Sequence, residues 1–241
     1  MNNILFLDIE TIPQFPSFED CPEPLQHLWS RKAENLRKIE GETASDVYNR
    51  AGIYAEFGRI VCISTGILTT ENGEPVLRIK SYFGDDEAAL LEEFARLLNR
   101  YFYKNDSKLC AHNGKEFDFP YIARRMVIHS IKLPALLDIA GKKPWEVNHL
   151  DTMEMWKFGD FKSYTPLNLL AHVLGIPSPK DDIDGSQVWS VYWHEKDLNR
   201  IVTYCEKDVH ALANVYLRMK GFPVIPKEQV VRVDGLVRHR P

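Results

Sequence analysis

In the stretch ILFLDIE, residues 4–10, a short apolar run is followed by two acids, Asp8 and Glu10. Such a run is typical of a buried strand. Side chains two residues apart in a strand point to the same face, so Asp8 and Glu10 are expected to emerge together at the strand's end. Burying two like charges is costly unless a cation or another partner compensates them. The stretch therefore predicts either a site for a cation or a strand end that reaches solvent.

The pattern that follows predicts a layered α/β domain with a mixed sheet. A run rich in β-branched residues at 59–68 and an alternating run at 76–83 flank Asn72-Gly73, which is a strong hairpin signal. Because a hairpin is antiparallel, the order of elements argues against a pure parallel β-α-β array and favours an α/β layer architecture. The other predicted elements are a helix at 86–103, a strand at 108–112, a helix at 117–128, a short strand at 149–152, and helices at 166–174, 187–193 and 197–219.

Length and composition indicate one main domain. The chain has 241 residues, of which 44% are hydrophobic and 27% charged, as in an ordinary globular protein. We expect a single domain over residues 1–221 and a C-terminal tail at 222–241. Within the domain, residues 15–52 begin with several prolines and continue with two amphipathic patterns, which indicates a helical insertion or lid.

The charge and cysteine content narrow the class of protein. A net charge of −4 argues against a broadly basic nucleic-acid surface, so any nucleic-acid role must depend on a local site. The four cysteines form no C-x-x-C pair, which favours reduced thiols and a cytoplasmic protein. We expect no signal peptide and no membrane span. Motifs typical of zinc, nucleotide, dinucleotide and serine-hydrolase sites are missing from the sequence.

Two further groups of residues place acids beside predicted elements. Asn113 to Asp118 follows the strand at 108–112, where an α/β sheet presents functional loops. Tyr204 and Asp208 lie four residues apart and so share one face of the last long helix, whereas Glu206 is expected in solvent. Each group alone has a structural explanation, since an acid stabilises the first turn of a helix and core tyrosines commonly precede exposed acids.

Taken together, the three groups resemble the three motifs of the DEDDy 3′–5′ exonucleases, which belong to the RNase H-like group. Asp8-Ile9-Glu10 is similar to the first motif, Asn113 to Asp118 to the N-x-x-x-F-D form of the second, and Tyr204 to Asp208 to Y-x-x-x-D, the third. The surrounding sequence resembles the exonuclease domain of family B DNA polymerases, and small stand-alone proteins similar to it, over about residues 1–219. Thr203 occupies the place of the histidine in the DEDDh relatives, so the tyrosine type is favoured.

This resemblance implies an RNase H-like mixed sheet, an antiparallel hairpin plus parallel strands, flanked by helices. It also implies hydrolysis of single-stranded DNA from the 3′ end by two divalent metal ions, Mg²⁺ or Mn²⁺, which clamp the attacking and leaving oxygens. Asp8 would bridge both ions, Glu10 and Asp208 would complete the first, and Asp118 would hold the second. Tyr204 would orient the attacking water, because a phenol with a pKa near 10 is a poor base at neutral pH.

Four more residues are candidates for contacts with the substrate. Thr11 and Asn113 lie beside the acids and could contact the terminal nucleotide. Phe117 could stack on a base, as aromatic side chains do in sequence-blind single-strand binders, or it could simply pack in the core. Lys180, in the loop before the helix at 187–193, could approach a phosphate.

Several alternatives remain open at this stage. The substrate could be RNA, which proteins distinguish from DNA by its 2′-hydroxyl group. The same fold could also serve as a non-catalytic nucleic-acid-binding or scaffold module, and binding of divalent metal would discriminate between the two. A protein partner, such as a polymerase, could contact residues 15–52 through Leu25, Leu28 and Trp29, although packing on the domain itself explains these side chains too.

Overall fold

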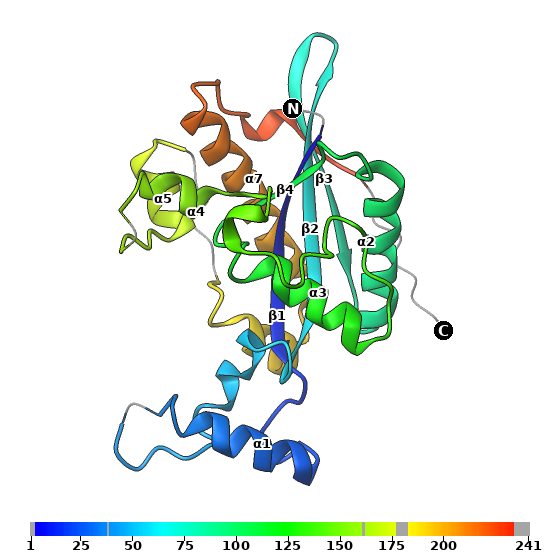
Figure 1. Ribbon diagram of the computed structural model, residues 1–241. Coiled ribbons are helices and arrows are strands. Elements are labelled where there is room, and N and C mark those ends of the chain that lie inside the picture. The colour runs from blue at the N-terminus through cyan, green and yellow to red at the C-terminus, as the bar shows by residue number, and fades with distance from the viewer. Residues whose placement is uncertain (1–2, 38, 161, 177–182, 234–241) are drawn as a thin grey trace.

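A computed structural model describes residues 3–37, 39–160, 162–176 and 183–233 (Figure 1). Its six-stranded sheet has the order β5-β4-β1-β2-β3-β6. The strands are β1 (Ile4–Pro13), β2 (Gly58–Glu71), β3 (Glu74–Phe83), β4 (Lys108–Ala111), β5 (Leu150–Asp151) and β6 (Val230–Arg232). The α-helices are α1 (Glu23–Ala33), α2 (Glu87–Tyr101), α3 (Asp118–Ile128), α4 (Thr152–Lys157), α5 (Leu167–Val173), α6 (Val188–Ser190) and α7 (Leu198–Met219). None of the described helices is long and apolar enough to cross a membrane.

The pairing of the strands confirms the predicted mixed sheet. β1 and β2 are antiparallel, as are β2 and β3, whereas β4 is parallel to both β1 and β5. The β2–β3 hairpin turns at Asn72 and Gly73, whose φ angles are 52° and 84°. Positive φ at both central residues is the geometry for which an Asn-Gly pair is suited. The fold class is therefore the expected mixed α/β sheet, an antiparallel hairpin plus parallel strands, flanked by helices.

The central strand is longer than the apolar run predicted. β1 continues to Pro13, so Asp8 and Glu10 lie inside the strand, not at its end as predicted from the sequence. The difference arises because β2 stays paired with β1 as far as the Pro13–Gly58 register, which keeps the backbone extended beyond the acids.

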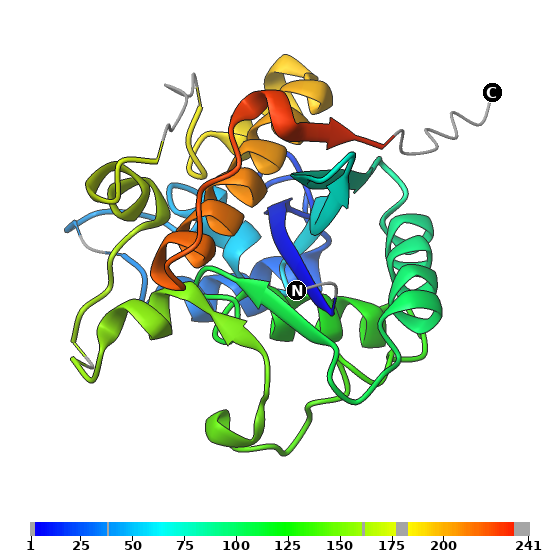
Figure 2. The same cartoon turned by 90° about the horizontal axis from the view of Figure 1, so that it is seen from above.

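β1 lies in a sheet with α7 on one face and α2 and α3 on the other (Figure 2), and its side chains alternate between the two cores formed there. Leu5 and Leu7 pack with residues of α2 and α3 on one face of the sheet, whereas Phe6 packs with residues of α7 on the other. Asp8 and Glu10 continue the row of Phe6, because side chains of a strand repeat every second residue. This alternation directs both acids toward α7.

Residues 15–57 form a small unit, here called the insertion lobe, which projects beyond the end of β1 (Figure 1). It contains α1 and a 3-10 helix at Tyr48–Ile53, packed around Trp29. The second amphipathic helix predicted in this segment is absent from its described residues, where the chain makes turns. Gly41 has a φ of 90°, and the Asp46 carboxylate accepts a hydrogen bond from the Thr43 backbone at 2.8 Å, so both residues favour turns over helix.

The side chains considered for a protein contact differ in exposure. Trp29 is fully buried in the lobe's own core, and its Nε1 donates a hydrogen bond to the Ala44 carbonyl oxygen at 2.8 Å. Leu25 packs against this core, whereas Leu28 is 55% exposed. Two of the three residues are thus explained by packing within the lobe, and a protein partner stays a prediction.

The C-terminal segment after α7 is integrated into the domain. β6 pairs with β3 in parallel. Ile225 is buried, and the Asn214 side chain of α7 both accepts a hydrogen bond from its N–H at 2.6 Å and donates one to its carbonyl oxygen at 3.0 Å. Residues 222–233 therefore close one edge of the sheet.

A buried ion pair ties α3 to α2 on the other face. Arg125 donates to Glu87 from Nε at 2.9 Å and from Nη2 at 2.5 Å, and each side chain is 4% exposed. Glu87 also accepts the N–H of Ile60 in β2, at 2.7 Å. Nη1 of Arg125 donates to the Ala55 carbonyl oxygen of the insertion lobe at 2.8 Å. One arginine thus joins two helices, a strand and the lobe.

Removing this arginine tests how much the network stabilises the fold. Arg125→Met should lower the free energy of unfolding by about 3–5 kcal/mol, because the buried Glu87 carboxylate loses both guanidinium hydrogen bonds and keeps only the Ile60 N–H and the His129 ring as partners. Urea unfolding followed by circular dichroism measures the change. Arg96→Met is a matched control on α2, since Arg96 is exposed and lies 3.6 Å from Glu92, and a loss of no more than about 1 kcal/mol is expected there. Equal losses in the two variants would contradict this role of Arg125.

Candidate active site

Three segments far apart in the sequence bring their acids together. β1 supplies Asp8 and Glu10, the first turn of α3 supplies Asp118, and α7 supplies Asp208. A cleft of about 430 Å³ lies at this meeting point. Its lining includes six of the residues selected from the sequence: Asp8, Glu10, Thr11, Phe117, Tyr204 and Asp208.

The acids on β1 are buried close to one another. Glu10 is 7% exposed, and burial raises its pKa well above the ordinary range, with the charges of Asp8 and Asp208 adding to the shift. Burial also raises the pKa of Asp8, and the charges of Asp208 and Asp118 act in the same direction. These shifts identify a cluster of carboxylates that repel one another, the situation in which a bound cation is stabilising.

Asp118 lies at the start of α3 and is 3% exposed. Burial raises its pKa to about 7, although hydrogen bonds from the backbone amides of Asp118 itself and of Ile9 oppose the shift. Asp118 is not part of the cleft lining, yet its charge raises the pKa of Asp8. Asp118 therefore belongs to the same electrostatic cluster, although it lies outside the cleft lining.

Asp151, which the sequence analysis did not select, holds the loop that carries Asp118. Its carboxylate is 3% exposed and accepts the N–H groups of Asn113 at 2.9 Å and Lys115 at 3.0 Å. It also caps α4 by accepting the N–H of Met153 at 3.0 Å. The strand predicted at 149–152 is present as β5, but no helix was predicted between it and 166–174, so α4 was missed. The sequence signal that could have predicted α4 was Asp151 itself, because aspartate is a preferred N-cap residue and it directly precedes Thr152, the first residue of the helix.

Tyr204 and Asp208 lie one turn apart on α7 and both line the cleft, as their spacing predicted. Burial raises the pKa of Tyr204, and the charges of Asp208, Glu10 and Asp8 raise it further. The side chain is therefore a neutral phenol at physiological pH. It can donate or accept a hydrogen bond in the cleft, but it is not a base.

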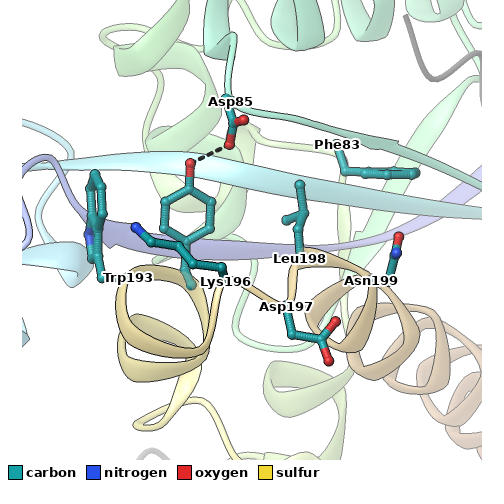
Figure 3. Close-up of a pocket in the computed structure, with 8 residues that line it drawn as sticks. Phe83, Asp85, Trp193, Lys196, Asp197, Leu198 and Asn199 are labelled. Carbon is teal, nitrogen blue, oxygen red and sulfur yellow. Dashed lines mark hydrogen bonds between the residues drawn. The ribbon is translucent and has the colours of Figure 1, made fainter. Parts of the chain in front are cut away.

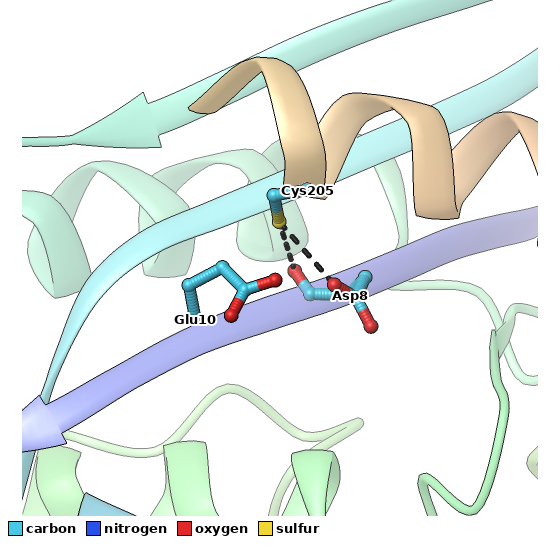
Figure 4. A group of neighbouring side chains, drawn as sticks. All are labelled: Asp8, Glu10 and Cys205. Carbon is cyan, nitrogen blue, oxygen red and sulfur yellow. Dashed lines mark hydrogen bonds between the residues drawn. The ribbon is translucent and has the colours of Figure 1, made fainter. Parts of the chain in front are cut away.

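Cys205 was not selected from the sequence but touches the acids. Its thiol donates hydrogen bonds to the carbonyl oxygen and to Oδ2 of Asp8, both at 3.4 Å (Figure 4). The ligand atoms of Asp8, Glu10 and Cys205 lie within 4.8 Å of one another. Burial raises the pKa of this thiol, so it acts as a donor to Asp8. The available signal was its position three residues before Asp208, on the same helix face.

The residues predicted to contact the substrate do not all lie at the carboxylate cleft. Thr11 and Phe117 line the cleft, and Phe117 also packs its ring against Tyr121 with centroids 5.3 Å apart, so it has a core contact too. Asn113 lines a different hollow of about 610 Å³, together with Lys115 and Tyr164. Lys180 lies outside the described residues.

Glu206 and two histidines have structural partners. Glu206 is not solvated as predicted, because it accepts hydrogen bonds from Ser81 at 2.9 Å and from Arg232 at 2.5 Å. His112 contacts Thr152 Oγ1 at 2.9 Å, and His210 contacts the Ile225 carbonyl oxygen at 2.7 Å. No cluster of histidine and cysteine ligands for zinc occurs in the described part of the chain.

The site is not the most spacious hollow of the protein. A hollow of about 790 Å³ lies beside the start of α7, where Tyr192 donates a hydrogen bond to Asp85 at 2.6 Å (Figure 3). Phe83, Trp193 and Lys196 line it, and it contains none of the acids of the three motifs. The chemistry of the lining, rather than its volume, therefore distinguishes the carboxylate cleft.

Comparisons with known proteins agree with this geometry. Residues 53–225 match the model of a family described as a predicted 3′–5′ exonuclease related to the exonuclease domain of PolB. The match contains Asp118, Tyr204 and Asp208, whereas Asp8 and Glu10 precede it. No curated protein matches the chain.

Two solved structures that resemble the chain share little of its sequence. One is the family B DNA polymerase of the hyperthermophilic archaeon Pyrobaculum calidifontis, at 14% identity and a TM-score of 0.45, over 90% of this chain but 25% of the polymerase. Another is the RNase domain of the yeast Pop2 protein, at 10% identity and a TM-score of 0.46, over 96% of this chain and 82% of that one. The family match covers most of the chain, which therefore belongs to the family of predicted 3′–5′ exonucleases related to the exonuclease domain of PolB.

Proposed function

We propose that the protein removes nucleotides from the 3′ end of single-stranded DNA by metal-dependent hydrolysis of the phosphodiester bond. The observation that carries this proposal is the convergence of acids from three chain segments: Asp8, Glu10 and Asp208 line one cleft, and Asp118 lies near enough for its charge to act on Asp8. Family membership supports the direction of cleavage. The choice of DNA follows the resemblance to polymerase exonuclease domains, and the experiment below tests it against RNA.

The donor set fits hard divalent cations. Carboxylate oxygens are the protein ligands that Mg²⁺ and Mn²⁺ prefer. Asp8, Glu10 and Asp208 would hold one ion, and Asp118, together with the bridging Asp8, would hold a second. When bound, such ions stabilise the negative charge that develops on the attacking and leaving oxygens. They would also relieve the repulsion that raises the carboxyl pKa values.

The remaining groups of the cleft would position the reactants. Tyr204, a neutral phenol, would hydrogen-bond the attacking water and hold it in line with the terminal phosphate. Cys205 would fix the orientation of Asp8 through its thiol hydrogen bond. The ring of Phe117, at the edge of the cleft, would stack on the terminal base. Such positioning contributes because small misplacements of reacting groups are costly.

A time course on 5′-labelled single-stranded DNA and matched RNA, with Mg²⁺ or Mn²⁺, tests the function. We expect DNA to shorten stepwise from the 3′ end, with no shortening in EDTA. Preferential shortening of RNA would show that the substrate is RNA and would leave the proposed reaction unchanged. Degradation of neither strand, with metal binding verified by calorimetry, would overturn the enzymatic proposal in favour of a binding module.

Substitutions in the cleft should separate the acids from the tyrosine. Asp208→Asn should reduce the rate at least about 100-fold by weakening a metal site. Tyr204→Phe should reduce kcat by about 100-fold at unchanged metal affinity, because only orientation of the water is lost. Tyr192→Phe is the matched control, since Tyr192 hydrogen-bonds Asp85 outside the cleft. A Tyr204→Phe variant as active as the control would remove Tyr204 from the mechanism.

The stability of the metal-free protein should depend on Asp118. Burial raises its pKa from 3.8 to about 7, so between these values the folded state keeps a proton that the unfolded state has lost. Stability therefore falls as the pH rises through this window. Asp118→Asn should raise the thermal midpoint at about pH 8 and leave it unchanged below about pH 4.

Thermal scans with and without Mn²⁺ measure both effects. Mn²⁺ should stabilise the wild type more than Asp118→Asn, because the variant has lost a ligand. Asp138→Asn, at an exposed position, is the control. A midpoint of Asp118→Asn that follows the wild type across the whole pH range would show that Asp118 does not carry the buried charge.

A further inference from the structure

We propose that the insertion lobe supplies a phosphate-binding subsite to the cleft, in which Arg50 binds a backbone phosphate of single-stranded nucleic acid. The inference rests on the proposed function and adds a role for a segment that the family match leaves almost entirely outside its bounds. Neither Arg50 nor its neighbour Asn49 was selected from the sequence.

The charge of the cleft is the first argument. Asp8, Glu10 and Asp208 form an acidic wall that would repel a polyanionic strand. The lobe contributes Asn49 and Arg50, both from the 3-10 helix, to the same lining, and Arg50 is the only Lys or Arg among the described residues of that lining. A guanidinium matches the geometry of a phosphate by donating parallel hydrogen bonds. Arg50 thus puts one fixed positive charge where a phosphate must pass.

Arg50 is available for such a contact. Its Nη1 donates one hydrogen bond, to the Leu36 carbonyl oxygen at 2.9 Å, and a guanidinium has five N–H donors. No ion pair found within the described ranges includes Arg50. The contact with Leu36 orients the side chain without neutralising it. A phosphate-binding arginine requires both a contact that fixes its side chain, here the hydrogen bond to Leu36, and further N–H groups that can donate to the phosphate.

The lobe segment that carries Arg50 is held against the acid-bearing elements. The carbonyl oxygen of Gly52 accepts a hydrogen bond from the Tyr121 hydroxyl of α3 at 2.7 Å. Gly52 also approaches β1 so closely that a Cβ on it would lie 2.9 Å from the Ile12 carbonyl carbon. Arg50, two residues away, is therefore placed relative to both β1 and α3. A phosphate bound to Arg50 would therefore lie at a fixed position relative to the carboxylate cluster.

Aromatic side chains at the cleft indicate that the strand enters unpaired. Phe117 and Trp189 both line it, and Trp189 Nε1 donates a hydrogen bond to the Pro16 carbonyl oxygen at the root of the lobe, at 3.3 Å. Aromatic faces together with a cation are the elements of single-strand binding, because every unstacked base offers a π face. A base-paired end would bury those faces within its own stack.

Binding in the absence of turnover tests the subsite. Fluorescence anisotropy would measure the affinity of a short fluorescein-labelled oligothymidylate for the Asp118→Asn protein with Mn²⁺, across a salt series. Oligouridylate and a blunt duplex form the other arms. The variants Arg50→Gln and Arg50→Lys are compared with Arg31→Gln, which removes the same charge from an exposed position of α1 outside the cleft.

Arg50→Gln should weaken binding of the single strand about tenfold and lower the slope of log affinity against log salt by about 0.7, the value for one phosphate contact. Arg50→Lys should keep the slope, and Arg31→Gln should keep both the affinity and the slope. In the protein with Asp118 intact, Arg50→Gln should raise KM more than it lowers kcat. The circular dichroism spectrum and thermal midpoint verify that each variant is folded.

Three outcomes would overturn the inference: unchanged affinity and slope in Arg50→Gln, an equal loss in Arg31→Gln, or a blunt duplex bound as tightly as the single strand. A parent protein that binds no strand would overturn it as well. The two proposals fail separately. If binding depends on Arg50 but the wild type hydrolyses nothing, the exonuclease proposal is wrong and the phosphate subsite stands. If the wild type hydrolyses the strand but binding does not depend on Arg50, the subsite is wrong and the exonuclease proposal stands.

Discussion

The structure depends on the placement of like charges on a buried central strand. β1 is covered on both faces, and its period of two directs Asp8 and Glu10 along the same row as Phe6, toward α7. Neighbouring carboxylates and burial raise the pKa of both acids. Such repulsion destabilises the protein without a bound cation, and it is expected where a protein binds cations. The acids stay close to one another because packing holds the elements that carry them in place.

Other interactions keep this repulsive cluster in place. Asp151 accepts backbone N–H groups from the loop before α3, which fixes the approach of Asp118 to β1. The Arg125–Glu87 pair then joins α3 to α2 and β2, while Cys205 donates from α7 to Asp8. Each contact is made away from the ligand-facing oxygens or by a neutral group. None of these three contacts places a cation on Asp8, Glu10, Asp118 or Asp208.

The insertion lobe completes the cleft with different chemistry. Its own core around Trp29 makes it a stable unit, and the hydrogen bond from Tyr121 to Gly52 together with the close approach of Gly52 to β1 joins it to the sheet domain. The acids come from the sheet and α7, whereas the one cationic side chain of the described lining comes from the lobe. This division matches the needs of a polyanionic substrate, whose reacting group requires metal ligands and whose backbone requires a positive charge.

Most of the elements and the three motifs follow from local spacing in the sequence, although α4 was missed and the second helix expected in residues 15–52 is replaced by turns in the described part of that segment. The apolar run before Asp8, the Asn72-Gly73 turn and the spacing of Tyr204 and Asp208 are local patterns, and the structure retains each of them. Only the tertiary structure decided that β1 extends past its acids, since that follows from pairing with β2. It also separated Asn113 from the cleft, made Glu206 a partner of Arg232, and brought Arg50 into the same cleft lining as the acids. These placements depend on contacts between residues distant in the chain, which no local period encodes.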